Sequence, residues 1–261
     1  MEERLSFRRL LLAALALVAG ALAASGTAAQ TGSAPDDFPL PPRAWPAPVH
    51  DTPVIPYLLV DRLEYRFTDG ADVRMWDLQA WVGSDYHKLW LKTEGEDEIG
   101  RRTEQGDAQL LYARLVSPFW YLQAGVRRHW RPAPSRNSLV LAAQGLAPGW
   151  FEVEASAFIE EGGRLSMRLE AEYDLLVTQR WILQPRLETN LASRSDQARG
   201  LGSGVNDVEL GLRLRYEIRR QFAPYIGVNW TRKLGTTANA ARAAGEGVSE
   251  ASVVAGVRAW F

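Results

Sequence analysis

The chain has 261 residues, 46% of them hydrophobic and 10% aromatic, which is enough for a sizeable buried surface and excludes disorder throughout. Its formal net charge of −1 leaves no basic excess to neutralise a nucleic-acid backbone, so we exclude nucleic-acid binding. The absence of cysteine excludes a disulfide framework and thiolate metal sites, and is compatible with an oxidising cell envelope.

Residues 1–29 have the three parts of a secretory signal peptide. A positively charged start is followed by an apolar run over residues 10–24, and small residues at 27–29 favour cleavage before Gln30. The alternative is an uncleaved membrane anchor, which is disfavoured because the run is shorter than the roughly 20 residues that a spanning helix needs. We therefore predict a secreted precursor.

Residues 30–56 contain eight prolines, which cannot donate to a β-ladder, so this stretch is predicted to be an extended or disordered periplasmic leader. From about Leu58 the pattern changes to segments of roughly ten residues that alternate apolar and polar side chains, as transmembrane barrel strands do. No later uncharged run approaches the length of a spanning helix, so a membrane-embedded chain has to be a barrel. We assign residues 57–261 to this barrel.

Twelve alternating segments follow one another in this domain, which predicts an all-β fold: a closed antiparallel barrel in the outer membrane of a Gram-negative bacterium. Both barrel ends are predicted to be periplasmic, which requires an even strand number. Ten strands is the alternative, if the first hairpin stays outside the barrel. The predicted strands cover residues 62–67, 76–82, 88–94, 108–112, 122–126, 139–146, 151–159, 164–175, 181–191, 207–217, 222–230 and 251–261.

A water-soluble β-sandwich also alternates, but three further features favour a membrane barrel. Short connections at 83–85, 116–118 and 219–221 alternate with long ones at 95–105, 192–206 and 231–250, which matches tight periplasmic turns and longer external loops. The chain stops on a strand that ends with Phe261, and a terminal aromatic resembles the recognition signal of outer-membrane proteins. Aromatic residues near the short-turn ends predict a girdle at the lipid headgroups: Trp81, Trp120, Trp150, Phe151, Tyr173, Trp181, Tyr216, Phe222, Trp260 and Phe261.

Four long runs, at 61–66, 86–96, 169–184 and 207–230 with the core YEIRRQFAPYIGVNW, resemble the copper resistance protein B family. The similarity extends over about residues 50–261. It implies an outer-membrane copper resistance barrel that is encoded with periplasmic copper-handling proteins and that binds copper ions or moves them. Its partners would be outer-membrane lipid, copper ions and those periplasmic proteins.

The leader departs from this family. Many members carry a methionine- and histidine-rich stretch before the barrel, whereas residues 30–56 hold His50 as their single histidine and no methionine. Soft ligands for Cu(I) are therefore scarce in the leader, and we expect little high-affinity copper binding there.

The lumenal face is the predicted functional surface, because the alternation places carboxylates beside arginines and lysines in a lumen that twelve strands should leave wide and wet. Two interpretations stay open. The carboxylates line a cation path, or they pair with the arginines to form a plug that narrows the bore. The carboxylates that we predict to interact with copper are Glu152, Glu154, Glu170, Glu172, Asp174, Glu94, Glu96 and Asp107.

Two further side chains are candidate copper ligands in the barrel. His129 is predicted on the lumenal face at an external strand end, and Met75 on the lumenal face near the opposite rim. An imidazole, a thioether and carboxylates together could bind a copper ion transiently, although each alone is more often a plain rim residue. His87 is predicted to face lipid at the periplasmic border, where an interfacial role is expected.

An enzyme is disfavoured. A serine hydrolase needs a histidine base beside its nucleophile, yet His87 and His129 are predicted at opposite ends and on opposite faces, and no G-x-S-x-G motif occurs. Two functions remain: a copper-permeable channel, and a non-conducting protein that binds copper and docks periplasmic partners.

Overall fold

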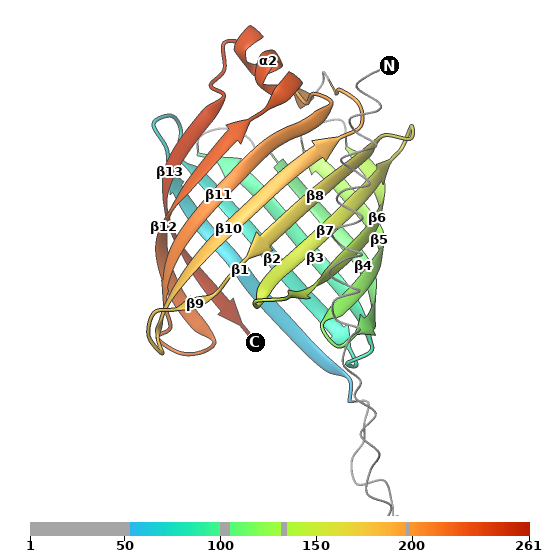
Figure 1. Ribbon diagram of the computed structural model, residues 1–261, viewed down its shortest axis with the longest axis vertical. Coiled ribbons are helices and arrows are strands. Elements are labelled where there is room, and N and C mark those ends of the chain that lie inside the picture. The colour runs from blue at the N-terminus through green and yellow to red at the C-terminus, as the bar shows by residue number, and fades with distance from the viewer. Residues whose placement is uncertain (1–52, 100–104, 132–134, 197–198) are drawn as a thin grey trace, which may run out of the picture.

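A computed structural model describes residues 53–99, 105–131, 135–196 and 199–261. The predicted signal peptide and nearly all of the leader, with His50, lie outside the described residues, so their roles stay predictions. The rest is a single antiparallel sheet that curls round and closes on itself (Figure 1). In this part of the chain no helix is long and apolar enough to span a membrane.

Closure is made by the first and last strands, which pair antiparallel from Leu59 opposite Trp260 to Phe67 opposite Val253. One element, β9 (Leu175–Leu176), has only two residues, so the wall consists of twelve long strands, as predicted. These are β1 (Ile55–Phe67), β2 (Val73–Gly83), β3 (His87–Glu98), β4 (Gln105–Ser117), β5 (Trp120–Arg131), β6 (Arg136–Ala147), β7 (Phe151–Glu160), β8 (Leu165–Glu172), β10 (Trp181–Ala192), β11 (Gly204–Tyr216), β12 (Phe222–Lys233) and β13 (Ser249–Trp260).

Most strands are longer than the sequence prediction, and two differences change how a segment is assigned. β1 begins at Ile55 and so includes Pro56, which we had assigned to the leader. Pro56 pairs only with Val82 of β2, because β13 joins β1 from Leu59 onward, so the missing proline N–H leaves no broken ladder bond on the β13 side. The predicted strand 164–175 is interrupted after Glu172, and β9 continues it along β10.

Both barrel ends lie at the same end as the tight turns, which is the periplasmic end in an outer-membrane barrel (Figure 1). The connections there include 84–86, 118–119 and 148–150, whereas the longest connections, at 193–203 and 234–248, lie at the external end. The asymmetry is less regular than predicted, since the connection around β9 is a longer periplasmic one.

The last external loop contains a helix that was not predicted from the sequence, α2 (Gly235–Ala243). Alanine is the strongest helix former, and four of its nine residues are alanine. The helix packs at the external rim through Thr237, whose hydroxyl accepts from the Gly202 amide at 2.8 Å and donates to Asn206 Oδ1 at 3.1 Å.

The wall has an apolar outside and a polar inside, as the alternation predicted. On β1, Leu63 and Phe67 are half exposed on the outer face. The alternate residues Arg62, Glu64 and Arg66 are buried in the lumen. A protein surface of this kind is stable only if lipid covers the outer face.

The predicted girdle is correct for most of its members and wrong for three. Trp150, Phe151 and Trp181 are exposed on the outside near the periplasmic end. Trp120, in contrast, is 0% exposed. Trp81 and Trp260 lie on the lumenal side, where their rings stack 5.5 Å and 6.2 Å from that of Tyr57. The alternation alone could not place Trp120, because a register shift between Leu115 and Ser117 precedes it.

The closing seam depends on Phe261, and we expect its deletion to impair barrel assembly. Its amide donates to the Leu58 carbonyl at 2.9 Å and its carbonyl accepts from the Leu58 amide at 3.0 Å, while its ring is exposed to lipid. Heat-modifiable migration on a gel measures the folded fraction. The matched control is Phe261→Tyr, which keeps both backbone bonds and an aromatic ring. An unchanged folded fraction after the deletion would contradict the role of this terminal residue.

Candidate functional site: the charged lumen

A β-bulge places two consecutive charged residues inside the barrel near the middle of β1. The register shifts between Val60 and Arg62, so both Asp61 and Arg62 project inward. Arg258 lies 3.1 Å from Asp61, and Arg62 lies 2.8 Å from Asp77. Asp61 was not among the residues predicted from the sequence to face the lumen. The signal was present, because three consecutive apolar residues at 58–60 break the alternation before it.

Ion pairs cross the bore between strands that are not neighbours. Lys92 on β3 lies 2.7 Å from Glu154 on β7, and Arg168 on β8 donates to Glu94 on β3. A second set joins β1 and β11: Arg213 lies 2.5 Å from Glu64, and Arg66 lies 3.2 Å from Glu209. These contacts span the lumen, as the plug interpretation requires.

Arg186 is the centre of this network. Its side chain is 2% exposed and its guanidinium contacts four carboxylates on three strands. The distances are 2.8 Å to Glu170, 2.9 Å to Glu172, 2.5 Å to Glu188 and 3.5 Å to Glu209. One cation therefore balances part of a carboxylate row that runs across β8, β10 and β11.

The predicted group on β7 and β8 is assembled as expected. Glu154 lies opposite Glu170 and Glu152 opposite Glu172 in the strand register. Arginine or lysine already pairs with most of this group, however, including Asp174, which lies 2.6 Å from Arg215. Within this predicted group, Glu152 is the one carboxylate that has no ion pair within 4 Å among the described residues.

The second predicted group lies in the external half. Glu94, Asp107 and His129 follow one another across β3, β4 and β5 in register. His129 Nδ1 lies 3.7 Å from Asp107 Oδ2. His129 Nδ1 and Asp107 Oδ1 are both buried without a hydrogen-bond partner in the described part of the chain. Buried polar atoms are normally paired, and here a nitrogen and an oxygen atom without partners belong to two residues that face each other, with Arg127 3.9 Å from the second Asp107 oxygen.

The predicted position of Met75 was wrong. β2 runs inward from the external connection 68–72, so Met75, near its start, lies in the same half of the barrel as His129 and not at the opposite rim. Its sulfur accepts a hydrogen bond of 3.1 Å from Arg66, and Arg66 also lies 3.2 Å from Glu96. The thioether and Glu96 are thus engaged by one arginine.

The described residues contain no group of three or more His, Asp or Glu side chains already arranged around a metal. His87 lies on the outer face at the periplasmic border, as predicted, with Nδ1 2.6 Å from the Tyr112 hydroxyl. The two barrel histidines are therefore far apart.

The lumen is less wet than predicted. Over β3 to β7 its face carries an apolar cluster formed by Trp90, Leu111, Val140 and Phe158 with neighbouring small residues. The Arg127 guanidinium lies 3.7 Å from the centre of the Phe158 ring. This cluster occupies part of the bore beside the charged residues of the same strands.

An ion-pair cluster outside the membrane holds the external connection 193–203 to neighbouring strand ends. Asp196 lies 2.6 Å from Arg136 and also pairs with Arg164. Burial alone would raise the pKa of Asp196, but the hydrogen bonds from these two arginines outweigh it and lower that pKa. The carboxylate therefore keeps its charge, and its hold on the connection, in acid that would protonate an ordinary aspartate.

The closed wall, the lipid-facing apolar surface and the charged interior define an outer-membrane β-barrel. The NanC porin shares this fold at a TM-score of 0.52 and 12% identity, covering 77% of this chain and 98% of the porin. That likeness concerns the fold alone.

Sequence comparison gives the family. The family model described as Copper resistance protein B precursor matches residues 54–261. Copper resistance protein B of Escherichia coli is 46% identical, and a Copper resistance protein B homolog of Pseudomonas syringae pv. tomato is 43% identical, each over 213 residues that cover 82% of this chain and 72% of the relative. The chain belongs to the copper resistance protein B family, and the resemblance noted from its sequence is confirmed.

Proposed function

We propose that this barrel binds copper ions within its lumen. The observation that carries the proposal is the pair formed by Asp107 and His129, whose buried oxygen and nitrogen atoms have no hydrogen-bond partner in the described chain. Imidazole nitrogen suits copper, and carboxylate oxygen is a second compatible donor. A bound cation would satisfy both atoms at once.

Glu94 is the third member of the proposed site, because it is the register neighbour of Asp107. Arg168 now pairs with it from the opposite wall, so copper has to compete with this guanidinium. Met75 and Glu96 stand in the same half and are held by Arg66. The carboxylates on β7 and β8 would form a second binding region nearer the periplasm, with Glu152 as its unpaired member.

Histidine substitutions test the site. His129→Gln in the purified full-length barrel is expected to lower copper bound per chain and to remove the nitrogen coupling from the Cu(II) electron paramagnetic resonance spectrum. The matched control is His87→Gln, on the outer face, which is expected to leave both signals unchanged. Loss of copper from the His87 variant with retention in the His129 variant would overturn the proposed ligand set.

The cross-lumen ion pairs favour a non-conducting barrel that presents copper to a periplasmic copper-handling partner. The pairs Arg168 with Glu94 and Lys92 with Glu154 join opposite parts of the wall and occupy the space an ion would need. Copper flux into liposomes discriminates between the two functions. We expect little flux through the intact barrel, and flux at porin-like rates would favour the channel instead.

A further inference from the structure

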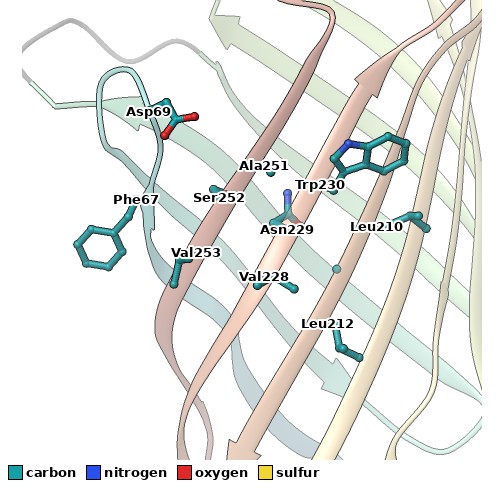
Figure 2. Close-up of a pocket in the computed structure, with 11 residues that line it drawn as sticks. Phe67, Asp69, Leu210, Leu212, Val228, Asn229, Trp230, Ala251, Ser252 and Val253 are labelled. Atoms are coloured by element: carbon teal, nitrogen blue, oxygen red, sulfur yellow. The ribbon is translucent and has the colours of Figure 1, made fainter.

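A hollow of about 500 Å³ opens on the outward face of the wall, across β11, β12, β13 and the end of β1 (Figure 2). Ala251 contributes only a methyl group to it and lies opposite Trp230 in the register of β12 and β13. Phe67 and Val253 stand on one side, and Trp230 lies beyond Ala251 on the other (Figure 2). Because this face is apolar and turned outward, its contents come from the lipid phase.

The hollow lies in the external half of the wall. β12 runs from Phe222 at the periplasmic end to Lys233 at the external end. Trp230 lies three residues before that external end. The Trp230 Nε1–H donates to Ser249 Oγ at 2.9 Å, which fixes the ring. Arg232 lies on the same face, two residues nearer the external end than Trp230. Its side chain is exposed and has no ion pair within 4 Å among the described residues.

We propose that this hollow and Arg232 bind one molecule of the phosphorylated, multiply acylated lipid of the outer leaflet, lipopolysaccharide. An acyl chain would lie in the hollow against Ala251 and Trp230, and a phosphate would pair with the Arg232 guanidinium. Arginine is well suited to phosphate because its planar donors bind two oxygens together. Asp69 lines the opposite rim and repels phosphate, so the headgroup lies on the Arg232 side.

A second, smaller hollow repeats the arrangement elsewhere on the wall. It has a volume of about 380 Å³ and is lined by Ala108, Leu110 and Val126, with Arg128 beside them. Ala108 lies opposite Arg128 in the register of β4 and β5, and Arg128 is exposed. Here the arginine itself lines the hollow, whereas Arg232 lies two residues beyond Trp230 on the first; both hollows thus have an outward arginine on their external side, as an anionic lipid would require.

Titration of lipopolysaccharide onto the delipidated barrel, followed by native mass spectrometry, tests the proposal. Arg232→Gln removes the cation, and Ala251→Phe fills the hollow on a face where no protein atom has to move. Each is expected to weaken binding about tenfold, as the loss of one charge-assisted contact would. The matched control is Arg114→Gln, an exposed arginine near the periplasmic end of β4, which is expected to bind as the unchanged protein does. Dephosphorylated lipid should bind equally to the Arg232 variant and the unchanged barrel.

Three outcomes would overturn the site. Unchanged binding by both hollow variants would show that the lipid binds elsewhere. An equal loss of lipid binding in the Arg114 variant would show that the overall charge of the barrel, and not this site, attracts the lipid. A shift of Ala251→Phe from dimer to monomer with unchanged lipid binding would assign the hollow to a contact between two copies of the chain. Heat-modifiable migration confirms that each variant is folded.

Discussion

Arg186→Met is expected to lower the free energy of unfolding of the barrel by about 3–5 kcal/mol, the range for breaking a buried ion pair by removing one partner. The substitution leaves Glu170, Glu172, Glu188 and Glu209 close together without their shared cation. The site is buried, since the Arg186 side chain is only 2% exposed. Repulsion among them should also loosen the plug, so copper flux through liposomes should rise above that of the unchanged barrel. Urea unfolding followed by tryptophan fluorescence measures the stability.

Arg74→Met is the matched control for the Arg186 variant. Arg74 forms an ion pair of comparable length, 2.8 Å to Asp97, but its side chain is 61% exposed. A solvent-exposed pair contributes about 0–1 kcal/mol, so this variant should unfold almost as the unchanged protein does and should not conduct. Equal losses of stability in the two variants would contradict a buried charge network centred on Arg186.

The second large effect concerns where copper binds. Copper bound per purified chain is expected to fall to the amount held at Asp107 and His129 when Glu152, Glu154, Glu170 and Glu172 become glutamine, and to change little when the leader is removed. The leader would have to be ordered around an ion at a cost of about 1–2 kcal/mol for each residue fixed, whereas the barrel is already rigid. Equilibrium dialysis with a copper assay measures the bound ion.

The structure sets the limits of the leader deletion. Because β1 begins at Ile55, the deletion has to end at residue 53 to leave the strand intact. The control for the glutamine variant is Glu246→Gln in the last external loop, whose partner Lys233 lies 2.9 Å away outside the lumen. Copper binding that is lost with the leader and retained in the four-glutamine variant would reject a lumenal site and favour docking through the leader.

The strand number, the closure and the face of most residues were predictable because a period of two is a local signal. Interruptions of that period were not. The bulge turns Asp61 inward beside Arg62, and the strand that begins at Leu165 breaks after Glu172; strand pairing shows both interruptions. The family resemblance added the link to copper resistance, which alternation cannot give.

The candidate site was predictable in its composition and not in its pairing. Alternation shows that Glu94 and Arg168 both face the lumen, but it contains no information on which residues meet across the bore. It also could not show that lumenal positions over β3 to β7 pack as an apolar cluster around Trp90 and Phe158. Those facts depend on the diameter and tilt of the closed wall.

The ion pair between Arg213 and Glu64 joins residues 149 positions apart in the chain, on strands that approach each other only when the last strand docks on the first. An open, partly folded sheet would therefore carry these charges hydrated and unpaired, facing a water-filled cleft. Seam formation and dehydration of the interior have to occur in the same step, so the final event of folding should be highly cooperative. Loss of the seam should release the interior charges together, as one unit.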